Sequence, residues 1–132
     1  MISPVLADRR VVREPGPDAS TGKWSARFSV EITEDEPVFA GHYPNSPIFP
    51  GVCVLECVQG AAESAPPPGA GRLEPAAVES ARFLSAVRPG DVLEIDLTWV
   101  PRGTDWRCNA KVETARGQAA SVRLRYRNGA TT

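Results

Sequence analysis

One histidine and one glutamate are the pair of side chains in this 132-residue chain best suited to acid–base chemistry on a single substrate. His42 is the only histidine, and Glu56 follows it fourteen positions later. A histidine with its ordinary pKa of ~6.5 can accept a proton near neutrality. A carboxylic acid can protonate a leaving group if apolar surroundings raise its pKa. Together they could remove a proton and a poor leaving group from neighbouring atoms.

The segment between these two residues predicts a stiff loop that runs into a helix. Pro44, Pro47 and Pro50 fix φ at every third position, so this stretch is expected to be extended. The helix is predicted over 52–64 from apolar residues at near-helical spacing. These residues are Val52, Leu55, Val58 and Ala62.

The start of the predicted helix supplies the remaining parts of a site. Its first N–H groups have no intrahelical partner, and its dipole is positive there. Gly51 lets a substrate approach the backbone, so its N–H is expected to hold a carbonyl oxygen that gains charge. Val52 is expected to line the same substrate site. Glu56, one turn further on among apolar neighbours, is expected not to be fully solvated, so that acid, base and donors converge on one apolar place.

Each residue alone has a simpler interpretation. A histidine in a proline-rich loop is often structural, and a helical glutamate is often solvated. The combination of His42 and Glu56 at this spacing, within this proline pattern, favours a joint site.

The remainder of the chain predicts mainly strands. Apolar and polar residues alternate with period two in several stretches, which is typical of half-buried strands. The sequence thus predicts one α+β domain over residues 1–132, in which a single helix covers an antiparallel sheet. The expected strands are 4–12, 24–32, 76–83, 93–99, 106–112 and 120–126, with turns at 14–22, 34–37, 66–71, 88–91, 101–104 and 115–117.

Composition excludes several classes of protein. The formal net charge is −1 and 42% of residues are hydrophobic, which argues against nucleic-acid or membrane-surface binding. No apolar run approaches the ~20 residues that cross a bilayer. The first ten residues do not resemble a signal peptide, so a cytoplasmic location is expected.

The three cysteines leave two alternatives. Cys53 and Cys57 lie four residues apart on the predicted helix, and with Cys108 and His42 they could form a zinc site. The simpler interpretation is that they are small buried packing residues in a reducing compartment. The second is favoured, so no metal is expected.

The stretch 41–56 resembles a known family. Its pattern Gly-His-aromatic-Pro-x-x-Pro-x-x-Pro-Gly-Val-x-x-x-Glu is similar to the active-site segment of the 3-hydroxyacyl-[acyl-carrier-protein] dehydratases. Glutamate rather than aspartate at position 56 resembles the plain dehydratase subfamily more than the dehydratase/isomerase subfamily. Residues 36–39, 79–83 and 88–91 also resemble the segments that flank this motif in the family.

The resemblance implies a hot-dog fold, in which a curved antiparallel sheet wraps around one central helix. It implies a lyase that dehydrates a 3-hydroxyacyl thioester to the trans-2-enoyl thioester in fatty-acid or polyketide biosynthesis. The substrate would be carried on the phosphopantetheine of acyl carrier protein, with no other cofactor. It further implies a homodimer, with the higher oligomeric state open, in which His42 of one chain meets Glu56 of the other.

The chain departs from the family pattern at one helix position. Relatives typically carry a glutamine four positions after the acid, where this chain has Gly60, and its Gln59 comes one residue earlier. A shift of one residue rotates a helical side chain by about 100°, so Gln59 is not expected to replace that glutamine.

Two further alternatives stay open at this stage. A hot-dog thioesterase would need a carboxylate and water but not His42, and a non-catalytic partner subunit would tolerate the change at position 60. A set of arginines is most simply a solvated face, or else it docks an acidic carrier protein. These are Arg82, Arg123, Arg125 and Arg127.

Overall fold

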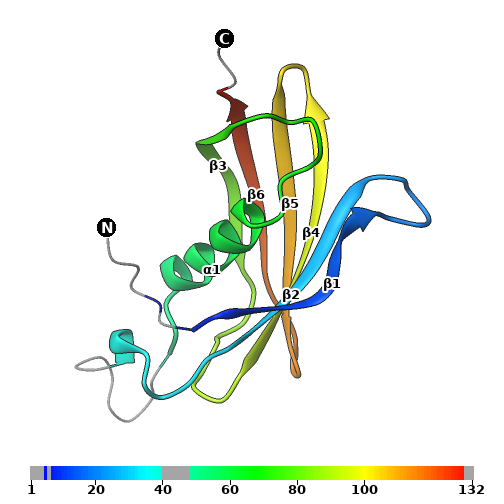
Figure 1. Ribbon diagram of the computed structural model, residues 1–132. Helices are drawn as coiled ribbons and strands as arrows, with labels where there is room; N and C mark the ends of the chain where they lie inside the picture. The colour runs from blue at the N-terminus through cyan, green and yellow to red at the C-terminus, as the bar shows by residue number, and fades with distance from the viewer. Residues whose placement is uncertain (1–4, 6, 40–47, 130–132) are drawn as a thin grey trace.

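The structure, a computed structural model, describes residue 5 and residues 7–39 and 48–129 (Figure 1). This part of the chain forms six strands, one α-helix and one short 3₁₀ helix. The elements are β1 Arg9–Pro17, β2 Trp24–Glu31, η1 Pro37–Phe39, α1 Gly51–Glu63, β3 Leu73–Phe83, β4 Val92–Arg102, β5 Asp105–Thr114 and β6 Gly117–Asn128.

The strands form one antiparallel sheet in the order β1-β2-β4-β5-β6-β3. Helix α1 lies against one face of this sheet, which curves around it (Figure 1). The predicted α+β architecture, with one helix on an antiparallel sheet, is therefore confirmed. The predicted helix and the five strands after the first are found within three residues of their expected bounds.

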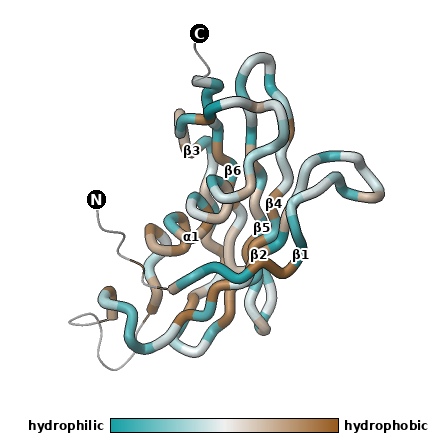
Figure 2. Tube along the Cα trace, viewed as in Figure 1, coloured by the Kyte–Doolittle hydropathy of each residue, from teal (hydrophilic) through white to brown (hydrophobic). Residues whose placement is uncertain are grey.

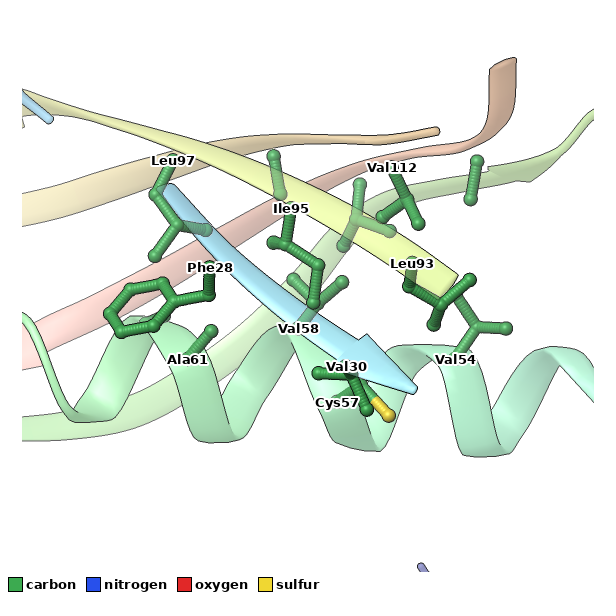
Figure 3. Close-up of a cluster of buried hydrophobic side chains, with 14 of the residues drawn as sticks. Phe28, Val30, Val54, Cys57, Val58, Ala61, Leu93, Ile95, Leu97 and Val112 are labelled. Carbon is green, nitrogen blue, oxygen red and sulfur yellow. The ribbon is translucent and has the colours of Figure 1, made fainter. Parts of the chain in front are cut away.

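Every second residue of each central strand is apolar, and these residues face the helix. Figure 2 shows apolar and polar positions alternating along the strands, and the burial pattern of β4 follows the same period. In Figure 3, Phe28, Ile95 and Leu97 lie opposite Val58 and Ala61 of α1. Each such fully buried large apolar side chain stabilises the fold by roughly 1.5–3 kcal/mol. The helix and sheet are thus held together mainly by apolar burial.

The buried stripe of α1 differs from the predicted one at the start of the helix. Val58 and Ala62 are buried, but Val52 is 68% exposed and Leu55 only half-buried. Pairs of adjacent residues in successive turns face the sheet instead. These residues are Cys53, Val54, Cys57, Val58, Ala61 and Ala62.

The first strand and its turn also differ from prediction. The strand begins at Arg9 and continues to Pro17, so residues 14–17 belong to a strand and not to the predicted turn. Its prolines are tolerated because β1 is an edge strand whose register shifts twice, after Val11 and after Arg13. The turn starts at Asp18, whose Oδ1 accepts hydrogen bonds from the N–H groups of Ser20 (2.8 Å) and Thr21 (3.0 Å).

All three cysteines are buried, as the packing interpretation predicted. Desolvation raises the pKa of Cys57 and of Cys108 to about 12 in each case, so both thiols stay protonated near neutrality. Among the described residues, no group of three His, Cys, Asp or Glu side chains is arranged to hold a metal ion. His42, the fourth member of the alternative zinc site, lies outside the described residues.

None of the helices in the described part of the chain combines the length and the apolar character that crossing a membrane requires.

An ion pair ties the turn before β4 to the β5–β6 hairpin. Arg116 donates through Nη1 and Nη2 to the two carboxylate oxygens of Asp91 (2.6 and 2.7 Å) and through Nη2 to the carbonyl of Ala86 (2.9 Å). Asp91 also accepts a hydrogen bond from the N–H of Arg88 (2.7 Å). These bonds, that from Arg116 above all, hold the pKa of Asp91 below its ordinary value.

Replacing this carboxylate should therefore destabilise the fold in a pH-dependent way. Asp91→Asn is expected to lower the free energy of unfolding at pH 7 by about 1 kcal/mol, because Arg116 is partly solvated. Because the pKa of Asp91 is lower in the folded state than its value of about 3.9 in the unfolded state, the carboxylate stabilises the fold at pH values above about 4. The difference in free energy of unfolding between wild type and variant should therefore shrink as the pH falls below about 4. Urea titrations at several pH values measure this, with Asp35→Asn at an exposed position as control. A difference that does not change with pH would contradict the assignment.

Candidate functional site

Glu56 lies one turn inside α1 and is half-buried, as expected. It lines a cavity of about 240 Å³ between the helix and the segment that leads into β1. The cavity wall combines apolar side chains with a few charged ones. It is formed by Val5, Ala7, Asp8, Arg9, Val30, Glu56, Cys57 and Gly60.

The backbone just before the helix is hydrogen-bonded to the segment between β3 and β4. Phe49 donates its N–H to the carbonyl of Val87 at 2.7 Å. Pro50 then precedes the helix in an extended conformation, and its carbonyl accepts the first intrahelical bonds from Cys53 (2.9 Å) and Val54 (3.1 Å). The N–H groups of Gly51 and Val52 therefore precede the hydrogen-bond ladder, where a helix presents donors to an anion.

Gly51 lines a second cavity, of about 270 Å³, on another side of the helix. Phe83, Leu84 and Ile48 belong to its wall and are 50%, 48% and 43% exposed. Five residues at about 100° each leave Gly51 and Glu56 about 140° apart around the axis. In the described part of the chain, Glu56 and Gly51 therefore line different cavities.

The close approach of Phe83 gives Gly51 a structural reason to be glycine. A Cβ atom at position 51 would lie 2.9 Å from Cε2 and Cζ of the Phe83 ring, closer than carbon atoms pack. The sequence indicated substrate approach at this glycine but not its aromatic neighbour. Phe83 belongs to the flanking segment that resembles the family, which was the one available signal.

Gln59 and Gly60 face different surroundings. Gln59 lines a third cavity together with residues of β3 and β6, including Val78 and Tyr126. Gly60 lines the cavity of Glu56. The expectation that Gln59 does not replace a side chain at position 60 is confirmed. The side chain of Arg9, which the sequence alone did not single out, lies in the space beside Gly60 instead.

His42, the expected base, lies outside the described residues. Val52 is at the helix start and exposed, so its side chain could contact a bound molecule. Two expected site residues, Glu56 and Gly51, are thus placed by the described structure on the two sides of one helix.

The arginines form part of an outer, polar surface. Arg82, Arg123 and Arg127 are exposed, in agreement with a solvated face. Arg125 differs, because it is half-buried and paired with Asp105 (3.1 Å) and Glu79 (3.6 Å). The positive charge of Arg125 is therefore paired with carboxylates of neighbouring strands.

Comparison with known proteins decides the family. The model of the ApeI dehydratase family matches residues 18–123, which is most of the chain. The chain belongs to the ApeI dehydratase family. The match includes the whole of α1, the four strands β2, β3, β4 and β5, and the first part of β6.

Members of the related 3-hydroxyacyl-[acyl-carrier-protein] dehydratases named FabZ are similar in sequence. The protein from Pectobacterium atrosepticum is 39% identical over 94 residues, which cover 65% of this chain and 62% of the relative. That from Symbiobacterium thermophilum is 38% identical over 100 residues, covering 73% of this chain and 66% of the relative. The match thus spans somewhat less than two thirds of the length of these relatives.

Solved structures show the fold. The dehydratase heterocomplex ApeI:P from Xenorhabdus doucetiae aligns with a TM-score of 0.67 at 17% identity, over 92% of this chain and 96% of that one. A Streptococcus mutans protein bound to acetyl CoA aligns with a TM-score of 0.71 at 13% identity, over 92% and 89%. The protein therefore has the hot-dog fold that the resemblance implied.

The contact between Gly51 and Phe83 can be tested by a double-mutant cycle. Gly51→Ala should lower the free energy of unfolding by about 1–3 kcal/mol, because the added methyl group meets an aromatic ring. In a Phe83→Ala background the same change should cost less, since the ring is gone. Chemical denaturation of the four proteins measures the coupling. Equal costs in both backgrounds would show that the two residues do not interact.

Proposed function

We propose that the protein dehydrates a 3-hydroxyacyl thioester, carried on acyl carrier protein, to the trans-2-enoyl thioester in fatty-acid or polyketide biosynthesis. The observation that carries the proposal is Glu56, which is half-buried one turn inside the helix of an ApeI dehydratase family member and lines a cavity with both apolar and charged walls. Similarity to the FabZ dehydratases supports the same reaction class.

The proposed reaction needs one base, one acid and one hydrogen-bond donor. His42 removes a proton from the α carbon while Glu56 donates its proton to the β hydroxyl group. The α C–H and β C–O bonds break, the α–β double bond forms, and water leaves. The Gly51 N–H at the helix start stabilises the charge that develops on the thioester oxygen, and Val52 lies beside it. Two carbon-bound groups are removed without any change of redox state, so the protein needs no redox cofactor.

A homodimer would complete such a site. In one chain Glu56 and Gly51 line different cavities, and a second copy would bring an acid from one chain to a donor from the other. Strand β3 is an edge of the sheet, and its Val78 and Phe83 are 43% and 50% exposed. An edge strand of this kind can pair with its symmetry copy.

The partner that delivers the substrate would be acyl carrier protein. Its phosphopantetheine arm would hold the thioester, and the exposed Arg82, Arg123 and Arg127 offer positive charge to an acidic carrier. Three buried, unpaired cysteines fit a reducing compartment, so we place the reaction in the cytoplasm.

Mass spectrometry of a 3-hydroxyacyl carrier protein tests the reaction directly. Wild type should remove one water from the acyl group, whereas His42→Ala and Glu56→Gln should lower the rate by about 100-fold or more, because each loses a proton-transfer group. Glu63→Gln is the matched control, since Glu63 is an exposed acid on the same helix outside the Glu56 cavity. Release of unacylated carrier protein would point to a thioesterase. No reaction from folded protein would favour a non-catalytic partner subunit.

The proposed dimer can be tested by native mass spectrometry. The isolated protein should have the mass of two copies, and Val78→Arg on the edge strand should shift it toward one copy, because a charge at the edge opposes pairing. Arg127→Glu, exposed on the neighbouring strand β6, is the control. A wild-type protein that stays monomeric alone, as an obligate member of a complex like ApeI:P would, contradicts the homodimer.

A further inference from the structure

The cavity of Glu56 contains a position without a side chain. Gly60 lies four residues after Glu56, so both are on the same face of α1, one turn apart. Both line the same cavity of about 240 Å³. A helical side chain at position 60 would extend back over the turn that carries Glu56. Here that volume is left open by the helix.

The side chain of Arg9 takes this volume. Arg9 begins β1 and is paired with the buried Val30 of β2, so it points to the same face of the sheet, toward the helix. A Cβ atom built on Gly60 would lie 2.5 Å from Nη1 and 3.4 Å from Cζ of Arg9. The polar start of β1 crosses near α1 in Figure 2. Glycine at position 60 is therefore what admits the guanidinium.

The guanidinium changes what the cavity can bind. The apolar part of the wall is formed by Val5, Ala7, Val30 and Cys57. A guanidinium has five N–H donors and no acceptor. An alkyl chain that covers it displaces the water to which these N–H groups donate and offers no acceptor in exchange. An oxygen acceptor on the chain would replace them with a charge-assisted bond.

We propose that Arg9 is a specificity-determining residue, which selects acyl chains bearing a neutral oxygen acceptor, a ketone or hydroxyl group, beyond the reacting carbons. The acceptor is neutral rather than a carboxylate because Asp8 lines the same cavity and its charge would oppose a second anion. The proposal deepens the proposed function, since it rests on that function for the acyl thioester substrate. A site built to hydrogen-bond a substrate rejects the analogue that lacks the group.

Binding of two unreactive thioesters to the intact protein tests this. One is a saturated six-carbon acyl pantetheine, and the other is the same compound with a ketone near the end of its chain. Neither has a 3-hydroxyl group, so binding is measured without turnover. Isothermal titration calorimetry should give a Kd about 10-fold or more lower for the ketone with wild type, the range expected for a hydrogen bond to a charged group.

Three variants locate the effect. Arg9→Met should abolish the preference, and Gly60→Ala should reduce it, because the new methyl group displaces the flexible guanidinium. Arg10→Met is the matched control: it removes the same charge from the next residue of β1, which points to the opposite face, and should keep the preference. If Arg9 only supported the structure, Arg9→Met would lower the melting temperature and leave the Kd ratio unchanged.

The outcomes separate this inference from the proposed function. Equal binding of both thioesters by wild type, or a preference that survives in Arg9→Met, overturns the role of Arg9 even if dehydration is observed. Failure to bind either thioester overturns the proposed acyl thioester function and the role of Arg9 with it. A preference lost in Arg9→Met and kept in Arg10→Met supports the assignment.

Discussion

The packing of α1 on the sheet is the constraint on which the rest of the site depends. Two adjacent residues in each turn, such as Cys57 and Val58, are buried against the strands. Because these positions fix the rotation of the helix, Glu56 must face the cavity beside β1, and Gly51 must face the side of Phe83. The same apolar contacts that stabilise the fold therefore determine which side chains are available for chemistry.

Beside two glycines of this helix, the space that a side chain would occupy is filled by a residue from a strand distant in sequence. Phe83 of β3 lies against Gly51, and the guanidinium of Arg9 of β1 lies against Gly60. The first contact is aromatic and belongs to the more apolar cavity, whereas the second brings a positive charge to the cavity of the acid. In each pair, the large side chain lies in the space that the glycine leaves free. A substitution at either glycine is therefore expected to displace the side chain of Phe83 or of Arg9, respectively.

Much of the architecture could be predicted from local patterns. Period-two alternation in β4, β5 and β6 is a property of short windows, and the structure confirms it. Of the predicted extended loop before α1, Pro50 is extended, whereas Pro44 and Pro47 lie outside the described residues. The extent of β1 could not be predicted this way. Pro15 and Pro17 argue for a turn locally, but an edge strand with shifted register accommodates them.

The surroundings of the candidate site residues could be predicted in part for the same reason. Glu56 and Gly51 follow from spacing within one segment, and the half-burial of Glu56 agrees with expectation. Arg9 and Phe83 were missed because their roles arise only when strands far apart in sequence meet the helix. The apolar stripe was misassigned at Val52, since apolar character alone does not show which side of a helix start the sheet covers.

The reverse reaction in oxygen-18 water would show whether the protein adds and removes water at the β carbon of an acyl thioester. A trans-2-enoyl carrier protein would be incubated with the protein in this water, and the position of the label would be read by fragmentation mass spectrometry. Wild type should place one oxygen-18 atom at the β carbon of a thioester that remains attached to its carrier, and Glu56→Gln should incorporate none. Label found instead in a free carboxylic acid, or no label with folded wild-type protein, would contradict the proposed dehydration.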